Sequence, residues 1–354
     1  MATDYKKTFE DLVETLIRED GSDLHISAER SPAIRVNGEL MFLLNHPALA
    51  QADLDGVLQA ILLKEHYQKF IDSQELDFSY TYQGTVRLRG NAFVQQGKYS
   101  IALRLIPHVK TIEELRLPPA LAEFARKRQG FFLVVGPVGQ GKSSTMASMV
   151  SLINEERAAH ILTIEDPIEY VYEQKKSMIN QREIGIDGKS FESSLKGAFR
   201  EDVNVILIGE MRTPETIATA VTAAETGHLV LSTLHTNNAS QTIDRIIDSF
   251  PPGQQDQIRI QLAASLIGVF SQRLVPRIAG GRVPAYELLI NNTAVANLIR
   301  EKRTHEIDMV IETGFEQGMV DMNRSLIELV RQGEITPETA FSYSLNPKNL
   351  ERLM

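Results

Sequence analysis

Hydrophobic and polar positions follow different patterns in the two parts of the chain. Near the start, apolar residues recur at the spacing of one helix face: Phe9, Leu12, Val13, Leu16 and Ile17. Farther on, residues 86–89 and 99–105 alternate apolar and polar side chains, which predicts strands with one buried face and one face that carries arginines. An Asn37-Gly38 pair between two short apolar runs predicts a hairpin turn. These patterns predict a small α+β domain over residues 1–107.

From Gly130 onward, short runs of consecutive apolar residues alternate with segments of helical periodicity. The runs are Phe131–Val135, His160–Ile164, Val205–Ile208 and Leu229–Leu234. Strands that are apolar on both sides are typical of parallel sheets that helices cover on both faces. We therefore predict an α/β domain over residues 119–354, with a helical, amphipathic last part from about residue 292. The stretch between the two domains, residues 108–118, is predicted to be a linker.

Composition narrows the class of protein. A chain of 354 residues is long enough for two domains. Its 37 Lys and Arg against 46 Asp and Glu leave a formal net charge of -9, which argues against nucleic acid as a partner, because excess positive charge holds the phosphate backbone. The absence of cysteine excludes disulfides, thiolate zinc sites, iron–sulfur clusters and a cysteine nucleophile.

The same patterns give no sign of a membrane segment. No apolar run reaches the roughly 18–20 residues that span a bilayer. Residues 1–19 lack the apolar core of a secretory signal. We therefore expect a soluble protein with no direct membrane insertion, whose contact with a membrane comes through a partner.

The clearest chemical signal is a glycine-rich segment that matches G-x-x-x-x-G-K-[ST]. It follows the apolar run Phe131–Val135 and precedes a helical segment, which is the context that this motif requires. Backbone N–H groups of such a loop wrap phosphate oxygens at a helix N-terminus, the lysine neutralises phosphate charge and the serine hydroxyl is a ligand of Mg²⁺. We predict that a nucleoside triphosphate binds with Mg²⁺ at Gly136, Pro137, Val138, Gly139, Gln140, Gly141, Lys142, Ser143 and Ser144.

Two further apolar runs end in carboxylates. Val205–Ile208 leads to Glu210, and ligands bind at the carboxyl ends of strands in open parallel sheets. Glu210 is therefore a candidate for holding the Mg²⁺ water shell or for polarising the attacking water. The run at 161–164 leads to Glu165, Asp166 and Glu169, a second group of candidate acids, and Pro167 keeps Asp166 out of helical geometry.

Histidines flank the last apolar run of the predicted sheet. His228 precedes Leu229–Leu234 and His235 follows it. A histidine after a strand is more often a hydrogen-bonded structural residue than a catalyst. His235 becomes a candidate because the topology predicts it at the same sheet edge as Gly136 and Glu210.

These four motifs, in this order, resemble the type II/IV secretion ATPase superfamily, whose members carry a Walker A motif, an aspartate box, a Walker B motif and a histidine box. Other segments are similar to its twitching-motility branch, the retraction ATPases of type IV pili. They are Gly21–His25, Arg35–Gly38, Gln181–Glu183, Ile208–Arg212, Thr233–Asn237, Asn297–Glu301, Gly318-Met319 and Ser325-Leu326. The resemblance covers nearly the whole chain and implies a PAS-like N-terminal domain followed by a RecA-like P-loop ATPase domain.

The resemblance also implies roles for single residues of the P-loop domain. Lys142 and Ser143 would bind phosphate and Mg²⁺, and Glu210 would be the Walker B glutamate beside the metal. Glu169 is a catalytic candidate and Glu165 a weaker one. Which of Glu169 and Glu210 accepts the proton stays open.

Histidine and arginine side chains complete the implied site. His228 and His235 correspond to the histidine box, with His235 the better candidate for sensing the γ-phosphate. Arg89 and Arg104 match N-terminal-domain arginines that reach the nucleotide at a domain or subunit boundary. Both lie on the polar face of a predicted sheet, where guanidinium groups suit bidentate contacts with phosphate oxygens.

The function that the resemblance implies is mechanical. In the family, six subunits form a ring, ATP binds between the N-terminal and P-loop domains, and hydrolysis moves one domain against the other. That movement turns an inner-membrane platform protein and extracts pilin subunits from the filament. The chain is therefore expected to be a homohexameric motor ATPase for pilus retraction and twitching motility. We expect it in the cytoplasm, peripheral to the inner membrane, with the platform protein as a direct partner and pilin as an indirect one.

The chain departs from the family pattern at several positions. Val138, Gln140 and Ser144 replace residues that are usually Thr, Ser and Thr, and we expect the backbone contacts of the loop to survive. Gly90 stands where a bulkier apolar residue is usual, which we expect to loosen that strand. Ala296 stands where retraction ATPases have the arginine of an A-I-R-N motif that retraction needs beyond hydrolysis. Our hypothesis is that hydrolysis is intact and coupling to the pilus is altered.

Other functions remain as alternatives. An accessory paralogue of the retraction ATPase would keep the same sites and depend on a primary motor. A non-hydrolysing ATP-binding scaffold is a second alternative, against which Glu169, Glu210 and Arg104 argue. Assembly and secretion ATPases usually carry a cysteine-rich zinc element, and this chain has no cysteine. The acidic charge disfavours a RecA-like motor that acts on nucleic acid.

Overall fold

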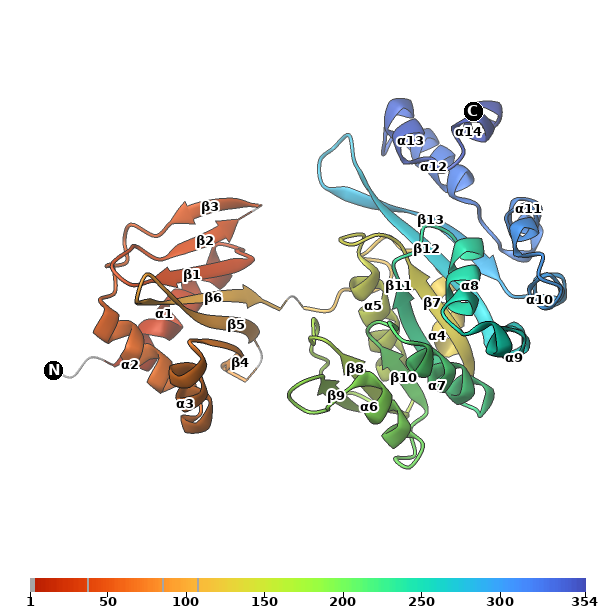
Figure 1. Cartoon of the computed structure of the whole chain (residues 1–354). Coiled ribbons are helices and arrows are strands. Elements are labelled where there is room, and N and C mark those ends of the chain that lie inside the picture. Colours follow the sequence, from red (N-terminus) through yellow and green to blue (C-terminus); the bar gives the residue numbers. More distant parts are fainter. Residues whose placement is uncertain (1–3, 37, 85, 107) are drawn as a thin grey trace. The chain divides into compact units, whose positions relative to one another are not determined.

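The chain forms two compact units in the computed structural model, which describes residues 4–36, 38–84, 86–106 and 108–354 (Figure 1). The first unit is Met1–His108 and the second is Val109–Met354. Helices and strands are mixed in both, and the predicted α/β fold class is confirmed. Val109, Ile112 and Leu115, which fall in the stretch predicted as a linker, pack against the core of the second unit.

The described part of the first unit is an antiparallel sheet in the order β3-β2-β1-β6-β5-β4 with three helices (Figure 1). Its elements are α1 (Tyr5–Arg18), β1 (Asp23–Ser27), β2 (Ala33–Val36), β3 (Glu39–Phe42), α2 (Gln51–Ile61), α3 (Lys64–Ser73), β4 (Glu75–Tyr82), β5 (Val86–Gln95) and β6 (Lys98–Leu105). The predicted apolar stripe of α1 is buried in the core of this unit, apart from Ile17. The predicted hairpin is also present, because β2 and β3 pair antiparallel beside Gly38, while Asn37 lies outside the described residues.

Gly90 has a packing role that the sequence did not reveal. It lies opposite Phe78 in the register of β4 and β5. A Cβ atom at Gly90 would lie 2.4 Å from Cζ of the Phe78 ring, so the ring occupies the space of the missing side chain. Phe78 is buried. The expectation that Gly90 loosens the strand is therefore not what the packing shows, since the aromatic ring fills the gap.

The second unit is built on a sheet in the order β13-β12-β7-β11-β10-β8-β9. The strands are β7 (Gly130–Val135), β8 (His160–Glu165), β9 (Met178–Glu183), β10 (Val205–Ile208), β11 (Leu229–Leu234), β12 (Leu266–Pro276) and β13 (Arg282–Ile290). All neighbours pair in parallel except β12 and β13, which form an antiparallel hairpin. The carboxyl ends of β7, β8, β10 and β11 therefore meet at one edge of the sheet.

Helices cover both faces of this sheet (Figure 1). Alternate residues of β7 show the two layers, because Phe131, Leu133 and Val135 enter one core cluster and Phe132 and Val134 enter the other. One layer contains α4 (Ala120–Arg126) and α5 (Lys142–Glu156). The other contains α6 (Phe191–Ala198), α7 (Pro214–Glu225), α8 (Ala239–Asp248) and α9 (Pro252–Ser265). This is the doubly covered arrangement that the continuous apolar runs predict.

The predicted helical part after residue 292 is present. It consists of α10 (Thr293–Arg300), η1 (Thr304–Glu306), α11 (Ile307–Thr313), η2 (Phe315–Gln317), α12 (Met322–Arg331), α13 (Pro337–Tyr343) and α14 (Pro347–Leu353). The last three helices pack on the β12–β13 hairpin around their own small apolar cluster. Ala296 is buried in α10, with 8% of its surface exposed, and belongs to the core layer of α6–α9.

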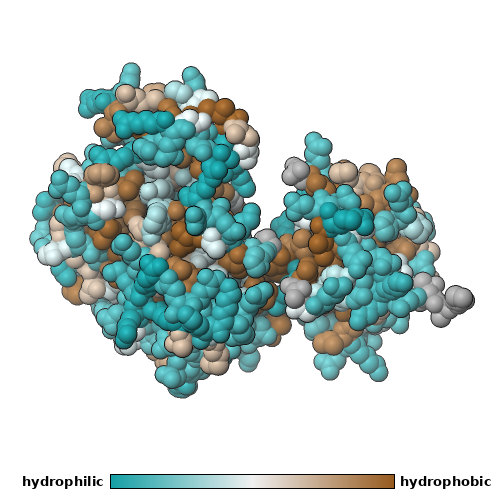
Figure 2. Space-filling view, turned by 180° about the vertical axis from the view of Figure 1, so that it is seen from behind, coloured by the Kyte–Doolittle hydropathy of each residue, from teal (hydrophilic) through white to brown (hydrophobic). Residues whose placement is uncertain are grey.

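Hydrophilic residues dominate the face that Figure 2 shows, and apolar residues appear there in separate patches. In the part of the chain that the structure describes, no helix combines the length and the apolar character needed to cross a bilayer.

Candidate functional site

The glycine-rich loop lies between β7 and α5, as its motif requires. Gly136 directly follows β7 with φ +146°, and Gly141 caps the N-terminus of α5 with φ +81°. A Cβ atom at Gly136 would lie 2.5 Å from the carbonyl oxygen of Gln272, so only glycine fits this close approach. The loop thus presents the N-terminal N–H groups of α5 at the carboxyl edge of the sheet, where an anion binds.

The neighbouring strand β12 braces the loop. The side-chain amide of Gln272 donates to the carbonyl of Gln140 at 2.8 Å, and its oxygen accepts from Thr145 at 2.6 Å. In return, the side-chain oxygen of Gln140 accepts from the backbone N–H of Leu274 at 2.6 Å. Gln140, one of the departures from the family pattern, therefore fixes the loop to β12. Val138, another departure, is exposed and leaves the loop backbone unobstructed.

Lys142 is held by carbonyl groups of its own loop. Its Nζ donates to the carbonyl of Gly136 at 2.8 Å and to that of Pro137 at 2.9 Å. Burial lowers the pKa of the amine to about 8, although the charges of Glu210 and Glu169 act in the opposite direction. Phosphate oxygens are stronger partners for an ammonium group than neutral carbonyls are. Lys142 is therefore placed to exchange these carbonyls for a bound phosphate.

His235 lies between Lys142 and Glu210. Its Nδ1 is 3.2 Å from Nζ of Lys142, and its Nε2 is 3.5 Å from Oε1 of Glu210. The other carboxylate oxygen of Glu210 accepts from Arg212, at 3.0 Å from Nε and 2.9 Å from Nη2. A second terminal nitrogen of Arg212 lies 3.9 Å from Asp166. One connected polar chain therefore runs through five side chains, those of Lys142, His235, Glu210, Arg212 and Asp166.

Glu165 is the buried acid of the site. It is the last residue of β8, with 8% of its surface exposed, and it accepts a hydrogen bond from the hydroxyl of Thr163 at 2.6 Å. Burial raises its pKa to about 7, against hydrogen bonds from Thr163 and Gln181 that lower it. A carboxyl group with a pKa near 7 is suited to accept a proton at neutral pH.

Glu169 is exposed and lies on the loop that follows β8. The next residue, Tyr170, ties this loop to the P-loop helix, because its hydroxyl is 2.6 Å from Oγ of Ser144. Gln181 of β9 donates to the carbonyl of Tyr170 at 2.8 Å. These contacts bring the aspartate box beside the first turn of α5, in which Ser143 is half-buried.

The donor set suits Mg²⁺. Mg²⁺ prefers hard oxygen ligands and usually takes one or two from the protein, with substrate phosphates and water supplying the others. Ser143 and Glu210 offer a hydroxyl and a carboxylate of this kind. Within residues 4–36, 38–84, 86–106 and 108–354, no three His, Asp or Glu side chains gather as a metal cluster.

His228 is not brought to this edge of the second unit. It precedes β11, whereas His235 follows it, so the six-residue strand separates them by roughly 20 Å. Nδ1 of His228 is 2.9 Å from the carbonyl of Ala223, and its ring contacts Phe199 edge to face. These are the contacts of a residue that fixes the turn between α7 and β11.

Arg89 and Arg104 lie side by side in the first unit. They are opposite each other in the register of β5 and β6, and Arg104 also faces Asp23 of β1. Nε of Arg104 donates to Asp23 at 2.8 Å, while most of the guanidinium side chain stays exposed. Burial raises the pKa of Asp23, but hydrogen bonds from Ser22 and Arg104 and the charge of Arg104 outweigh it, and the pKa lies below its usual value. Two arginines on one polar face are suited to an anionic group.

Comparisons with known proteins agree with this geometry. The family model described as "Type II/IV secretion system protein" matches residues 5–314. The chain belongs to the type II/IV secretion system protein family. Its predicted resemblance to the retraction ATPases is confirmed by relatives with those names, the first of which is a twitching motility protein of Neisseria gonorrhoeae. That relative is 45% identical over 322 residues, which cover 90% of this chain and 86% of the relative.

Two further matches extend over nearly the whole chain. The type IV pilus retraction ATPase PilT of Pseudomonas aeruginosa is 42% identical over 333 residues, 94% of this chain and 96% of the relative. A crystal structure of the pilus retraction motor PilT with bound ADP is 46% identical, with a TM-score of 0.90, and covers 97% of this chain and 98% of its own. The fold and its P-loop site are therefore those of a secretion-family ATPase.

Several residues of the site were not predicted from the sequence. Gln272 and Arg273 of β12 are buried, and Arg273 donates to the carbonyl and side-chain oxygens of Asn237, directly beyond the histidine box. Burial lowers the pKa of Arg273. The available signal was three consecutive polar residues, Ser271 to Arg273, inside an otherwise apolar strand. Arg212 and Tyr170 lie directly beside predicted acids, and their spacing from those acids was the available signal.

Proposed function

We propose that this family member is a motor ATPase that hydrolyses ATP to drive retraction of type IV pili. Two proteins that match over nearly the whole chain are named as a type IV pilus retraction ATPase and as a pilus retraction motor. The observation that supports hydrolysis most directly is the contact chain from Lys142 through His235 to Glu210, at 3.2 and 3.5 Å. It connects a phosphate-binding lysine with an acid at the position where a γ-phosphate is expected.

The residues of the site suggest how the reaction proceeds. Lys142 leaves its loop carbonyls for the phosphate oxygens and offsets their charge. A carboxylate accepts the proton of the attacking water as the bond between the water oxygen and the γ-phosphorus forms and the bond to the β-phosphate oxygen breaks. Glu169 and Glu210 are the candidates for this proton, and Glu165, with its pKa of about 7, is a third. Ser143 and Glu210 would hold Mg²⁺, which supplies charge neutralisation at the phosphates.

The contacts of His235 would change when a γ-phosphate binds. This histidine contacts the lysine that binds phosphate and the Walker B acid at the same time. A bound phosphate that draws Lys142 away removes one of these contacts, so the imidazole and the loop after β11 respond to the nucleotide. Arg273 holds the same loop through Asn237 and would transmit that response to β12.

Coupling to movement is proposed to use the first unit. Arg89 and Arg104 present exposed guanidinium groups on one face of its sheet, suited to phosphate oxygens in a bidentate manner. In the proposed homohexamer they would reach the nucleotide at a domain or subunit boundary. The ring would act in the cytoplasm, at the inner membrane, on the platform protein of the pilus and through it on pilin.

The accessory-motor alternative is supported by one specific observation, Ala296 in place of the usual arginine of the A-I-R-N motif. An accessory motor would hydrolyse ATP with the same site and would support retraction only beside a primary motor. The scaffold alternative lacks such support, because Lys142, His235 and Glu210 are all present and in contact.

The deciding experiment measures Mg²⁺-dependent ATP hydrolysis and particle mass on the same purified samples. Wild type is compared with Lys142→Ala and Glu210→Ala, and with Lys348→Ala and Glu351→Ala, two exposed positions in α14 that serve as matched charge controls. We expect the wild type to be a hexamer that hydrolyses ATP. The Lys142→Ala and Glu210→Ala variants should lose this turnover, and the two α14 variants should keep it. Nucleotide binding without turnover in wild type would overturn the motor proposal.

Whether the ATPase drives pilus retraction is tested in living bacteria. Expression in a bacterium that lacks its own retraction ATPase is expected to restore twitching, and the Lys142→Ala variant is not. Restoration only when a primary retraction ATPase is also present identifies an accessory motor.

A further inference from the structure

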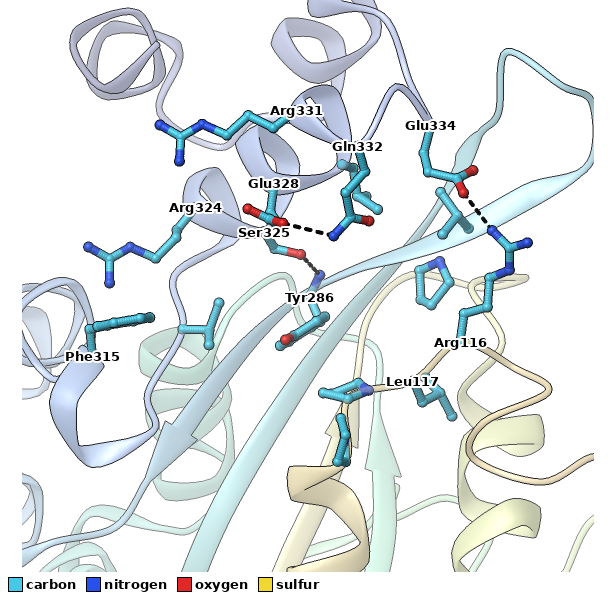
Figure 3. Close-up of a pocket in the computed structure, with 16 residues that line it drawn as sticks. Arg116, Leu117, Tyr286, Phe315, Arg324, Ser325, Glu328, Arg331, Gln332 and Glu334 are labelled. Atoms are coloured by element: carbon cyan, nitrogen blue, oxygen red, sulfur yellow. Dashed lines mark hydrogen bonds and ion pairs between the residues drawn. The ribbon is translucent and has the colours of Figure 1, made fainter.

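A cavity of about 690 Å³, called the groove below, opens in the second unit beside its C-terminal helices (Figure 3). It is lined by residues 116–119, by β13, by η2 and Val320, and by α12 with the turn that follows it. It therefore lies between the stretch that follows the first unit in sequence and the C-terminal helices. None of the predicted ATPase residues lines it.

The floor of this groove is apolar and aromatic. Leu117, Pro118 and Pro119 contribute one side, and Tyr286 lies at the centre, where its backbone N–H donates to Ser325 at 3.0 Å (Figure 3). Phe315 lies at the rim, with 58% of its surface exposed. An exposed aromatic ring beside an apolar hollow is typical of a binding surface.

On the side of the groove near residue 116, the charged side chains already form ion pairs with one another. Arg116 pairs with Glu334 at 2.7 Å, and Glu334 also pairs with Arg277 at 2.5 Å. These pairs hold the stretch before α4 to the turn after α12. Glu334 therefore adds little negative charge to the groove, because two guanidinium groups share it.

The two arginines of α12 that line the groove differ, because they lack such ion pairs in the part of the chain that the structure describes. Among the described residues, no carboxylate forms an ion pair with Arg324 or Arg331. Both side chains extend to the same side of α12, and the guanidinium of Arg324 lies 4.2 Å from the centre of the Phe315 ring (Figure 3). The carboxylate of Glu328 between them accepts instead from Gln332 at 2.8 Å. In a chain of net charge -9, two arginines without acidic partners beside an apolar groove form a local site for anions.

The spacing of the two arginines indicates the form of the ligand. They are seven residues apart on a helix, which separates their Cα atoms by roughly 10 Å along the axis. In an extended segment of the polyproline II type, which has three residues per turn, acidic residues three positions apart point to the same side and are separated by about the same distance, at roughly 3.1 Å per residue. An apolar side chain between those acids points to another side of the segment, where it can face Tyr286 and the prolines.

We propose that this groove binds an extended acidic segment of a partner protein, with two carboxylates three residues apart and an apolar residue between them. Arg324, stacked on Phe315, takes one carboxylate in a bidentate manner, and Arg331 takes the other. The bound segment also contacts residues 117–119, of which Leu117 is already buried in the core of the second unit. The groove is thus a docking site that is separate from the ATPase residues and does not depend on the proposed motor function.

The test selects ligands for the full-length protein from a display library of random short peptides. We expect enrichment of sequences with two acidic residues at the i and i+3 spacing around an apolar residue. The double variant Arg324→Glu/Arg331→Glu is expected to lose these sequences and to bind the best one at least about tenfold more weakly in fluorescence anisotropy. Its ATP hydrolysis and its thermal midpoint should remain those of wild type.

Arg128→Glu/Arg352→Glu is the matched control, because both positions are exposed and lie outside the groove. It should keep the wild-type affinity. A library without acidic enrichment, or acidic peptides that bind the groove variant and wild type equally, would overturn the proposal. So would a cross-link from position 331 to a second copy of the chain within the ring, because the groove would then be a subunit interface.

Discussion

Nζ of Lys142 lies 3.2 Å from Nδ1 of His235, and this contact sets the direction of a hydrogen-bond chain. A protonated amine only donates, so Nδ1 accepts and the ring proton is on Nε2. Nε2 faces Oε1 of Glu210 at 3.5 Å. Lys142 and Glu210 are thus connected through one imidazole, which contacts both side chains.

Replacing this imidazole tests its role in turnover. His235→Ala is expected to lower kcat for ATP by roughly 10²-fold, the usual loss when one positioned polar group is removed from a charge-stabilising site. Nucleotide affinity should change much less, because Lys142 and the loop backbone remain. Single-turnover hydrolysis and equilibrium binding of a fluorescent ADP analogue measure the two quantities separately.

His228→Ala is the companion variant. His228 lies at the other end of β11 and holds the carbonyl of Ala223, so its loss should cost about 1 kcal/mol of stability and leave turnover within about twofold of wild type. A loss of turnover as large as that of His235→Ala would show that both histidines act in catalysis, as the family resemblance implies, and would refute the separation drawn from the strand.

Lys142 should make nucleotide binding dependent on pH. Its pKa of about 8 without nucleotide must rise when anionic phosphates stabilise the charged amine. Binding above about pH 8 therefore takes up a proton, and affinity falls as the pH rises through this range. Titration calorimetry in buffers of different ionisation enthalpy should show uptake of close to one proton per nucleotide at about pH 9.

Lys142→Arg is the control for this effect. Arginine stays charged throughout the range, so any nucleotide that still binds should do so without that proton. Equal proton uptake by wild type and the arginine variant would assign the effect to another group.

The local motifs were predictable and the contacts between them were not. Lys142, Glu210 and His235 were identified because each stands at a fixed position beside an apolar strand, and parallel strands bring such positions to one edge. The contacts between distant segments depend on the register of the strands. Gln272 meets the P-loop, and Phe78 covers Gly90, only through pairings between segments that are distant in sequence. Periodicity indicates which face is buried, but it does not indicate which residue lies opposite.

Glu287 should make stability depend on pH. It is 6% exposed in β13 and accepts from the N–H of Ala239 at 2.8 Å, and burial raises its pKa to about 7 from 4.5. A raised pKa in the folded state means that its stabilising effect is complete below about pH 4.5 and is lost as the pH rises through about 7.

Glu287→Gln stays neutral, so it should exceed wild type in stability by up to about 3 kcal/mol at about pH 8 and show no gain at about pH 4.5. Urea unfolding at both pH values measures this, with the exposed Glu351→Gln as control. A gain that does not change with pH would contradict the assignment.

Gly90→Ala should destabilise the first unit, although Gly to Ala in a strand is usually favourable. The new Cβ would lie 2.4 Å from the Phe78 ring, and overpacking of this kind costs about 1–3 kcal/mol. Gly253→Ala is the matched control, because nothing lies within 4 Å of its Cβ position. In the double variant with Phe78→Ala, the cost of Gly90→Ala should largely disappear, as a double-mutant cycle by thermal unfolding would show. Additive costs would mean that the ring does not determine the choice of glycine.

Ala296→Arg tests whether coupling, rather than hydrolysis, is altered in this chain. Ala296 is 8% exposed in α10, so an arginine there must run its aliphatic stem along the helix surface to bring its charge to solvent. If the missing guanidinium limits retraction, the variant should increase twitching while ATP turnover stays within about twofold of wild type, because α10 contributes no residue to the P-loop site. Ala296→Gln, which is long and polar but uncharged, is the control for the steric change. An arginine variant that is folded, hydrolyses ATP and leaves motility as it was would refute the hypothesis. Equal gains from arginine and glutamine would assign the effect to the shape of α10 rather than to the charge.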